Sequence, residues 1–306
     1  MAIFYMLVGL PGSGKTHYAN EYLKKENTTI LSSDEIRKVL LGSEEAQWGN
    51  SAVFDAMNRS AIENLKQGRD VIYDATNINS KRRMALLEQI KKEVKEDIFF
   101  MAIILATPYE ICVERQQQRE RKVPEEVINK MIKNFEVPYY EEGWDEILIE
   151  NSAFNQNSYM TPDNFIKKYE KYNQENPYHN LSLGLHVKFA VDKYYELVAS
   201  NTIEYSRLIY NALVFHDFGK PFCRTTDDKG IGHYYNHNNV GAYLFLCNYF
   251  VRSLPRRERI QIAKLIEWHM LELTEKALRR RRIENTEYPQ MLKIIQECDK
   301  YRKVDN

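Results

Sequence analysis

The sequence predicts an α/β domain with a parallel sheet flanked by helices, followed by an all-helical domain. Three observations predict it. Short apolar runs alternate with helical patterns up to about residue 150, helical patterns rich in histidine fill the second half, and a polar, aperiodic stretch separates the two. A chain of 306 residues also has room for two domains of ordinary size. We place the first domain at residues 1–152, a linker at 153–164 and the second domain at 165–306.

Five apolar runs of the first domain are typical of buried strands. They are IFYMLVG (3–9), TTILSS (28–33), VIYDAT (71–76), IFFMAIIL (98–105) and DEILIEN (145–151). Helical patterns fill the gaps, including one that runs from the first strand through Lys25 and one at 54–68 that ends on a glycine. Strands that alternate with helices favour parallel pairing and right-handed crossovers. We therefore expect a parallel sheet covered by helices.

The character of the chain changes after residue 150. The stretch NSAFNQNSYMTPDN (151–164) has the polarity of a linker, and from Phe165 onward the patterns are almost entirely helical. Six of the seven histidines lie in this half, at positions 179, 186, 216, 233, 237 and 269. This crowding of histidine marks a second domain with a chemistry of its own.

The composition limits the class of protein. The chain is 43% hydrophobic and 28% charged, which suits folded cores, and its 43 basic and 43 acidic residues cancel. A chain-wide attraction to nucleic acid is therefore excluded, and such binding must come from local basic patches. Four candidates occur at 81–83, 115–122, 256–259 and 279–282, although each is also typical of a solvated helix face.

Cysteine usage and hydropathy indicate a compartment. The four cysteines form no CxxC pair, which argues against a disulfide framework or a zinc-thiolate site and favours a reducing environment. The apolar start lacks the basic region and cleavage site of a signal peptide, and no apolar run approaches the ~18 residues that span a membrane. We expect a soluble, cytoplasmic protein that does not contact membranes.

The stretch GLPGSGKT (9–16) matches the pattern G-x-x-x-x-G-K-[ST] and lies between a predicted strand and a predicted helix. Glycines let the loop backbone point its N–H groups at phosphate oxygens, and the following helix N-terminus adds positive potential. The lysine can reach the β- and γ-phosphates, and the threonine hydroxyl can bind Mg²⁺. The predicted ATP-binding residues are Gly9, Gly12, Ser13, Gly14, Lys15 and Thr16.

Polar residues follow the second and third predicted strands at the edge that faces the phosphates. Asp34 and Arg37 in SSDEIR share a helix face, where a carboxylate can take the proton of an attacking hydroxyl and an arginine can hold a phosphate. The alternative is an aspartate that caps the helix beside a surface arginine. In YDATNIN, Asp74, Thr76 and Asn77 reach the same edge.

The segment RQQQRERKVPEEVI (115–128) carries arginines ahead of a helix that begins at a proline. Arginines on a mobile segment can close over transferring phosphates as a lid. Arg115 and Arg119 share a helix face, whereas Arg121 leaves that face if the helix continues.

Together these stretches resemble the 5′-hydroxyl polynucleotide kinase family over residues 1–150. The resemblance rests on GxxGSGKT, a DxxR after the second strand, a DxTN after the third, and an arginine lid followed by VP and a helix. It implies a P-loop kinase domain that uses ATP and Mg²⁺, held by Lys15 and Thr16. At the acceptor it implies Asp34 as general base, Arg37 on the transferred phosphate, Arg119 or Arg121 in the lid, and Asp74, Asn77 and Arg115 on the substrate.

In the second domain, VFHDFGKP (214–221) places His216 beside Asp217 in an apolar run. Such a pair alone is more often structural, but four further candidate ligands surround it in the sequence, namely His186, His237, His269 and Asp299. Imidazole and carboxylate groups bind one or two divalent metals such as Mn²⁺, Fe²⁺, Co²⁺, Ni²⁺ or Zn²⁺. Ligands on separate helices can converge in a bundle core, and adjacent side chains diverge by ~100°, so the aspartate can bridge two metals.

Such a metal pair activates water to attack a phosphoester. Lys220 could then neutralise a phosphate oxygen, or it could be an exposed lysine at a helix end. His233 has no evident ligand role and is favoured as a structural residue, and His179 as a turn or cap residue.

This order of residues, with HDFGKP and GHYYNHNNVGAYLF, resembles the HD phosphohydrolase superfamily over residues 175–303. The resemblance implies an HD-type helical domain with His186, His216, Asp217 and Asp299 as core metal ligands. His237 and His269 would be ligands of a second metal.

The two resemblances together imply a bifunctional enzyme that heals nucleic-acid ends. It would phosphorylate 5′-OH ends with ATP and remove a 2′, 3′ or 2′,3′-cyclic phosphate, as RNA or tRNA repair requires. The expected partners are RNA or DNA ends, with RNA favoured, and an RNA ligase and a second copy of the chain remain open. The alternatives are a small-molecule kinase joined to a (d)NTP or cyclic-nucleotide phosphohydrolase, and a non-catalytic ATP switch.

Overall fold

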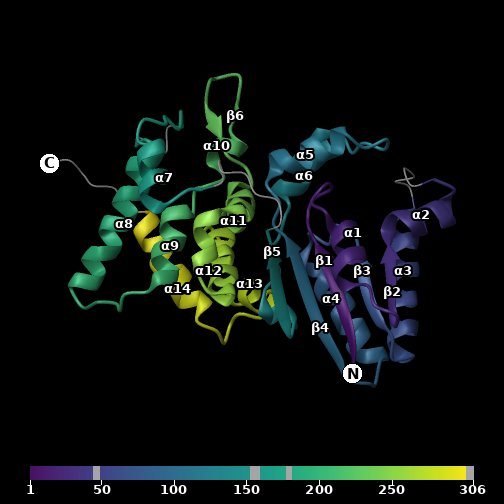
Figure 1. Ribbon diagram of the computed structural model, residues 1–306. Helices are drawn as coiled ribbons and strands as arrows, with labels where there is room; N and C mark the ends of the chain where they lie inside the picture. The colour runs from purple at the N-terminus through teal and green to yellow at the C-terminus, as the bar shows by residue number, and fades with distance from the viewer. Residues whose placement is uncertain (44–48, 152–158, 177–180, 301–306) are drawn as a thin grey trace. The chain divides into compact units, whose positions relative to one another are not determined.

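Figure 1 shows a computed structural model of the chain, which describes residues 1–43, 49–151, 159–176 and 181–300. The chain divides into two compact units. The first comprises Met1–Ile128 and Pro138–Ala153, and the second comprises Asn129–Val137 and Phe154–Asn306. Within the described residues, no helix is long and apolar enough to cross a membrane.

The first unit is built on a five-stranded sheet. Its strands are β1 (Ala2–Val8), β2 (Thr28–Ser32), β3 (Asp70–Asp74), β4 (Ile98–Leu105) and β5 (Glu146–Glu150). They pair in the order β2-β3-β1-β4-β5, and every pairing is parallel. The predicted parallel α/β sheet is confirmed, with strand ends within two residues of those expected. Since β1 lies between β3 and β4, the loop that follows β1 emerges in the middle of the sheet.

Helices connect these strands as parallel pairing requires. They are α1 (Lys15–Tyr18) with a π-helical continuation η1 (Ala19–Leu23), α2 (Ser33–Leu41), α3 (Asn50–Lys66), α4 (Ser80–Glu93), α5 (Tyr109–Gln117), α6 (Glu125–Lys133) and the 3₁₀ turn η2 (Tyr140–Glu142). The helix expected through Lys25 ends earlier, because Lys24 adopts extended backbone angles. Apolar side chains of β1, β3 and β4 form a core against the buried Ala19 and Leu23.

The second unit is mainly helical. Its elements are α7 (Pro162–Lys168), α8 (Leu183–Ala199), α9 (Arg207–Phe215), α10 (Lys220–Cys223), α11 (His237–Cys247), the 3₁₀ turn η4 (Tyr249–Ser253), α12 (Arg256–Trp268), α13 (Glu275–Arg280) and α14 (Tyr288–Asp299), with a short hairpin of β6 (Thr225–Thr226) and β7 (Gly232–His233). In Figure 1, α8, α9, α11, α12 and α14 gather as a bundle. Contacts between α11 and α12, and of α9 with both α12 and α14, hold it together.

Two boundaries differ from those that the sequence suggested. Helix α7 begins at Pro162, inside the proposed linker 153–164, because Thr161 caps it by accepting a hydrogen bond from Asn164 N (3.1 Å) and proline suits the first helical turn. Residues 153–158 of that linker lie outside the described part.

The second difference concerns residues 129–137, which the sequence assigned to the first domain. They group with the second unit, where the buried Phe135 ring packs against Tyr243 with centroids 4.8 Å apart. Val137 N donates to Glu267 Oε2 (2.8 Å), and Lys264 Nζ donates to Val137 O (3.1 Å). Packing against α11 and two hydrogen bonds between the Val137 backbone and α12 side chains therefore hold this segment, and neither is visible in local sequence patterns.

A buried ion pair connects α4 to the turn η2 in the first unit. Arg83 donates from Nε to Glu142 Oε2 (2.8 Å) and from Nη2 to Oε1 (2.5 Å). Glu142 also accepts hydrogen bonds from Ser80 Oγ (2.7 Å) and Trp144 Nε1 (2.8 Å). Arg83 is 1% exposed, so the basic patch 81–83 is only partly a solvated helix face.

Glu142→Ala is expected to destabilise the first unit by about 3–5 kcal/mol, because it leaves the Arg83 charge buried without a counter-ion. Urea unfolding of the first unit, followed spectroscopically, measures this change in the free energy of unfolding. Glu63→Ala on the exposed face of α3 is the matched control and should stay within about 0.5 kcal/mol of the parent. A loss below about 1 kcal/mol for Glu142→Ala would show that the pair does not support the fold.

Candidate functional site

The loop after β1 has the backbone shape of a phosphate-binding loop. Gly12 and Gly14 have φ angles of 81° and 93°, which side-chain-bearing residues rarely adopt. A Cβ atom on Gly12 would also lie 2.4 Å from the carbonyl oxygen of Cys112. Lys15 Nζ donates to the carbonyl oxygens of Gly9 (3.0 Å) and Leu10 (2.8 Å), so its ammonium is held over the loop. Burial lowers the pKa of Lys15 below its ordinary value, and Asp74 opposes that change.

Thr16 and Asp74 meet at the carboxyl end of the sheet. Thr16 Oγ1 donates to Asp74 Oδ2 (2.7 Å), and Asp74 is the last residue of β3 and 5% exposed. Burial raises the pKa of Asp74, and Lys15 partly offsets this rise. A loop hydroxyl beside an aspartate at a strand end is the arrangement that holds Mg²⁺ in P-loop enzymes. The structure thus puts Asp74 beside the expected magnesium ligand, whereas the sequence analysis assigned it to the acceptor strand.

Asp34 lies between two arginines. Arg37 Nη1 is 2.8 Å and Arg121 Nη1 is 3.3 Å from Asp34 Oδ1. Ser32, not Asp34, caps α2 by accepting from Glu35 N (3.4 Å). Arg37 is 6% exposed, so the alternative of a capping aspartate beside a surface arginine is wrong. The side chain of Asp34 is 53% exposed and accessible to an acceptor hydroxyl.

The other arginines of the lid segment lie near the loop. Arg115 Nη1 approaches Gly12 O (3.4 Å). Helix α5 ends at Gln117, so the helical face expected for Arg115 and Arg119 does not form, and Arg119 N instead bonds Gln116 O (3.3 Å) in a turn. The charge of Arg119 adds to the lowering of the Lys15 pKa and opposes the rise in the Asp74 pKa. The segment therefore brings positive charge to the loop through irregular backbone.

Asn77 has a structural task. Its side-chain nitrogen donates to Leu7 O (2.7 Å) and more weakly to Ala75 O (3.3 Å) and Tyr73 O (3.4 Å). Its φ angle is 50°, a conformation that asparagine tolerates better than most residues. This amide ties the ends of β1 and β3 together, and contact of Asn77 with the acceptor strand stays a prediction.

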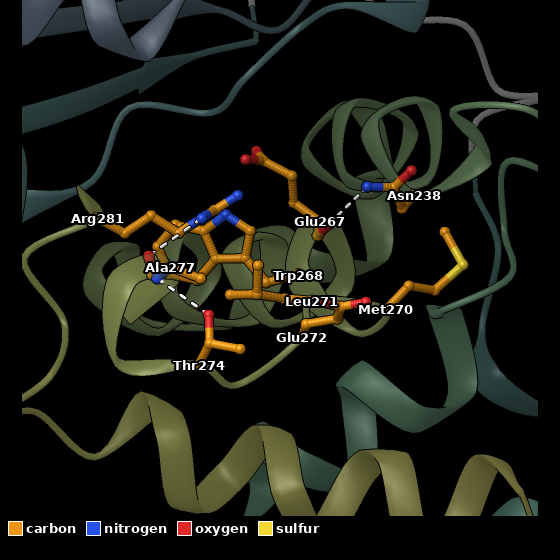
Figure 2. Close-up of a pocket in the computed structure, with 9 residues that line it drawn as sticks. All are labelled: Asn238, Glu267, Trp268, Met270, Leu271, Glu272, Thr274, Ala277 and Arg281. Atoms are coloured by element: carbon orange, nitrogen blue, oxygen red, sulfur yellow. Dashed lines mark hydrogen bonds between the residues drawn. The ribbon is translucent and has the colours of Figure 1, made fainter. Parts of the chain in front are cut away.

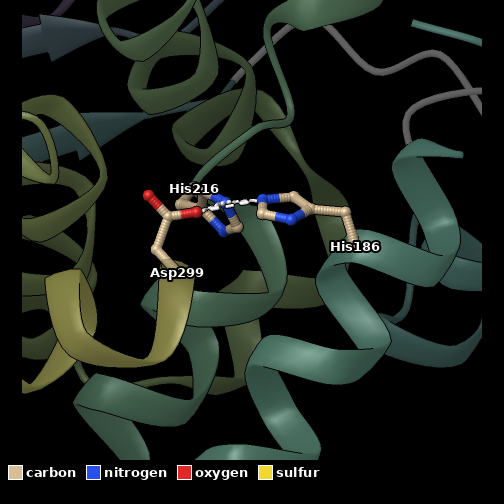
Figure 3. A group of neighbouring side chains, drawn as sticks. All are labelled: His186, His216 and Asp299. Carbon is tan, nitrogen blue, oxygen red and sulfur yellow. Dashed lines mark hydrogen bonds and ion pairs between the residues drawn. The ribbon is translucent and has the colours of Figure 1, made fainter. Parts of the chain in front are cut away.

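The second unit brings three predicted ligands from three helices into one group, which Figure 3 shows. His186 lies on α8, His216 directly follows α9, and Asp299 ends α14. His186 Nε2 is 3.2 Å from His216 Nε2 and 2.9 Å from Asp299 Oδ1, and His216 Nε2 is 3.1 Å from Asp299 Oδ1. Ligand atoms bound at ~2.0–2.1 Å around one tetrahedral ion are separated by about 3.3 Å, so this spacing suits a single metal.

Asp217, His237 and His269 form a second group. His237 Nε2 is 3.1 Å from Asp217 Oδ1 and 3.4 Å from His269 Nε2. The other oxygen, Asp217 Oδ2, is 3.4 Å from His186 Nε2 and 3.3 Å from His216 Nε2. One carboxylate thus faces both groups with different oxygens, as the bridging prediction requires.

The histidine rings are oriented by the main chain. The Nδ1 atoms of His216, His237 and His269 lie 2.7, 2.8 and 2.7 Å from the carbonyl oxygens of the residues three positions earlier. A carbonyl can only accept, so each Nδ1 carries the proton and each Nε2 is left as the ligand atom. These carbonyls are the outer contacts that the sequence analysis missed, although the position of each histidine at a helix end could have indicated them.

Charge in this cluster favours a cation. Burial alone would lower the pKa of His216, but Asp217 and Asp299 raise it to about 10. Burial also disfavours ionised Asp217, yet Lys220 and His216 hold its pKa well below the ordinary value. Burial lowers the pKa of His269 to about 3. Asp217 is buried, and its Oδ2 lies 2.7 Å from the Lys220 ammonium, so this lysine supplies positive charge beside the carboxylate.

Lys220 is 4% exposed, so the alternative of an exposed lysine at a helix end is wrong. Its ammonium lies 2.7 Å from Asp217 Oδ2 and donates to Gln174 Oε1 (2.8 Å). Gln174 is fully buried, and no sequence pattern pointed to it. His233 pairs with Asp227 (3.1 Å) in the hairpin, consistent with a structural role, and His179 lies outside the described residues.

Comparison with known proteins adds a family match for the first unit. Residues 4–138 match the family model described as an AAA domain. The first unit has the P-loop kinase fold. The chain is 33% identical over 146 residues to L-seryl-tRNA(Sec) kinase of Methanococcus maripaludis, which covers 46% of this chain and 55% of the relative. It is 26% identical over 152 residues to a "Putative bifunctional polynucleotide phosphatase/kinase" of Acanthamoeba polyphaga mimivirus, covering 46% of this chain and 31% of the relative.

Among solved structures, the Pnkp1/Rnl/Hen1 RNA repair complex contains a chain that is 24% identical, with a TM-score of 0.38 over 44% of this chain and 43% of that one. The chain spans about half the length of the first curated relative and about a third of the second.

Proposed function

We propose that this chain is a bifunctional enzyme that heals broken nucleic-acid ends, with RNA as the favoured substrate. The first unit transfers the γ-phosphoryl group of ATP to a 5′-hydroxyl, and the second unit removes a 2′, 3′ or 2′,3′-cyclic phosphate. The observation that carries the proposal is that one chain combines a phosphate-binding loop near Asp34 with two His/Asp groups that share Asp217. The healed ends are those that an RNA ligase joins, so such a ligase is the partner that fits this chemistry.

In the kinase reaction, Lys15 would bind the β- and γ-phosphates, and Thr16 with Asp74 would hold Mg²⁺. Mg²⁺ neutralises the charge that develops on the phosphates. Asp34 is exposed enough to accept the proton of the attacking 5′-hydroxyl. Arg37 and Arg121 both contact Asp34, which keeps positive charge at the point where the transferred phosphoryl group would pass.

In the phosphohydrolase reaction, His186, His216 and Asp299 would hold one metal, and His237 and His269 the other, with Asp217 between them. Two such metals supply an activated water and stabilise the leaving oxygen of a phosphoester. Lys220 contacts Asp217 from a buried position, so we assign it the task of orienting this carboxylate.

The name of the mimiviral relative, a polynucleotide phosphatase/kinase, supports a polynucleotide acceptor. The relative of Methanococcus maripaludis raises a second acceptor, the seryl hydroxyl of an aminoacylated tRNA. Both names place the acceptor hydroxyl on a nucleic acid or its aminoacyl group, which separates these acceptors from those of a small-molecule kinase.

An acceptor comparison tests the proposal. The protein with ATP and Mg²⁺ should phosphorylate a 5′-OH oligoribonucleotide more efficiently than free nucleosides or a seryl-tRNA. With Mn²⁺, Co²⁺ or Ni²⁺ it should also release phosphate from the 2′- or 3′-phosphate end of an oligonucleotide. Turnover confined to small metabolites, or phosphoryl transfer confined to seryl-tRNA, would contradict the polynucleotide assignment.

A further inference from the structure

A cavity of about 460 Å³ opens in the second unit between the end of α12 and α13. Figure 2 shows that Trp268 and Leu271 form its floor, that Arg281 extends along one edge, and that Asn238 and Met270 lie toward the other. Cavities of this size suit a small organic group and not only an ion. Neither proposed reaction uses the residues that line this cavity, apart from their neighbours His237 and His269.

The walls of the cavity are chain neighbours of the second ligand group. Asn238 directly follows His237, and Trp268 and Met270 flank His269. These lining residues and the ligands His237 and His269 are therefore neighbours along the chain, at the start of α11 and the end of α12. Asn238 Nδ2 also donates to Glu267 O (2.6 Å), which fixes the start of α11 against the end of α12.

The lining is mixed. Trp268, Met270 and Leu271 are apolar, Arg281 is cationic, and Glu267 and Glu272 carry carboxylates. Trp268 is held rigidly, since its ring meets Tyr288 edge-on at 5.3 Å and lies 4.2 Å from Lys264 Nζ. Met270 is 54% exposed and offers an adaptable apolar surface. The Arg281 guanidinium lies 6.0 Å from the Trp268 ring and donates to Ala277 O (3.1 Å).

Arg281 belongs to the basic run 279–282, whose other three arginines are exposed. An apolar floor suits a base and ribose, whereas a run of exposed arginines suits phosphodiester groups. A free phosphate would contact the arginines but would leave the apolar floor unused.

We propose that this cavity, the nucleoside pocket, binds the terminal nucleoside of the strand whose 2′- or 3′-phosphate reaches the metal ligands. The arginine run 279–282 then holds the preceding phosphodiester. This inference rests on the proposed phosphohydrolase function and adds its substrate class, a polynucleotide end read as nucleoside plus backbone. The pocket selects nucleotide substrates over other phosphoesters of equal reactivity.

Filling the pocket tests the inference. Ala277→Phe puts a ring into the cavity from α13, and Met270→Ala removes apolar wall from an exposed position that tolerates change. The substrates are a 5′-phosphorylated dinucleotide with a 3′-phosphate, which is no kinase acceptor, and p-nitrophenyl phosphate, which has no nucleoside. The preference for the dinucleotide, as the ratio of kcat/KM values, should fall at least about 10-fold in Ala277→Phe and less in Met270→Ala. Ala199→Phe, at the exposed end of α8, should keep the parental ratio.

An unchanged ratio in a folded Ala277→Phe protein overturns the pocket and leaves the proposed function intact. If the parent hydrolyses neither substrate with any of the metals, the proposed function fails. In that case the dissociation constant of the same dinucleotide tests the pocket independently of catalysis. Equal dissociation constants for the parent and both pocket variants would overturn the pocket.

Discussion

Asp217→Asn is expected to reduce phosphate release from a 2′- or 3′-phosphate end by at least about 100-fold while phosphorylation of 5′-OH ends continues. The reason is geometric. Asp217 presents Oδ1 to His237 and Oδ2 to His186 and His216, so its carboxylate serves both ligand groups at once. Asparagine keeps the volume but loses one ligand oxygen and the negative charge that balances two cations. Bound metal per chain, measured by elemental analysis, should fall together with the rate.

Asp192→Asn, on the exposed face of α8, is the matched control for this substitution and should retain both metal and activity. Since Lys220 pairs with Asp217, Lys220→Met combined with Asp217→Asn removes the buried charge that the single variant leaves. Normal metal content and normal phosphate release in a folded Asp217→Asn protein would mean that the His/Asp groups are structural.

Asp34→Ala is expected to have the complementary effect, with phosphorylation of 5′-OH ends reduced about 10²–10⁴-fold and phosphate release unchanged. Removing this carboxylate takes away the expected proton acceptor and leaves Arg37 and Arg121 without their shared partner. Transfer of labelled phosphate from ATP to an oligonucleotide measures the loss.

Asp97→Ala, at an exposed position before β4, is the control and should transfer phosphate at the parental rate. A non-catalytic ATP switch predicts another result. In that case the parental protein shows no magnesium-dependent transfer, and Asp34 is dispensable.

The parallel sheet of five strands and the convergence of the ligands could be predicted from the sequence, because both follow from patterns with a fixed geometric meaning. Alternating apolar runs and helices specify a parallel sheet, and a chain of His and Asp residues on successive helices specifies a common core site. In the structure the five strands pair in parallel, and the six ligand residues gather in two neighbouring groups.

The side-chain contacts that the sequence did not reveal involve partners far along the chain. Arg83 looked like part of a solvated patch, yet Glu142 lies 59 positions away and buries it. Lys220 looked as suited to the surface as to the site, and its partner Gln174 is 46 positions away. Asn77 matched a substrate-binding motif, but its amide is used by the carbonyl of Leu7 on the neighbouring strand. Side-chain hydrogen bonds across such separations leave no periodic trace in a sequence.

The central claim is that two separate active centres in one chain act on opposite ends of a nucleic-acid break. The most direct test is an RNA that carries a 5′-OH and a 2′,3′-cyclic phosphate, incubated with ATP, Mg²⁺ and Mn²⁺, followed by analysis of both end groups. We expect the parental protein to heal both ends, Asp34→Ala to heal only the phosphate-bearing end, and Asp217→Asn to heal only the 5′ end. Loss of both reactions in either folded variant would contradict separate centres and indicate one shared site.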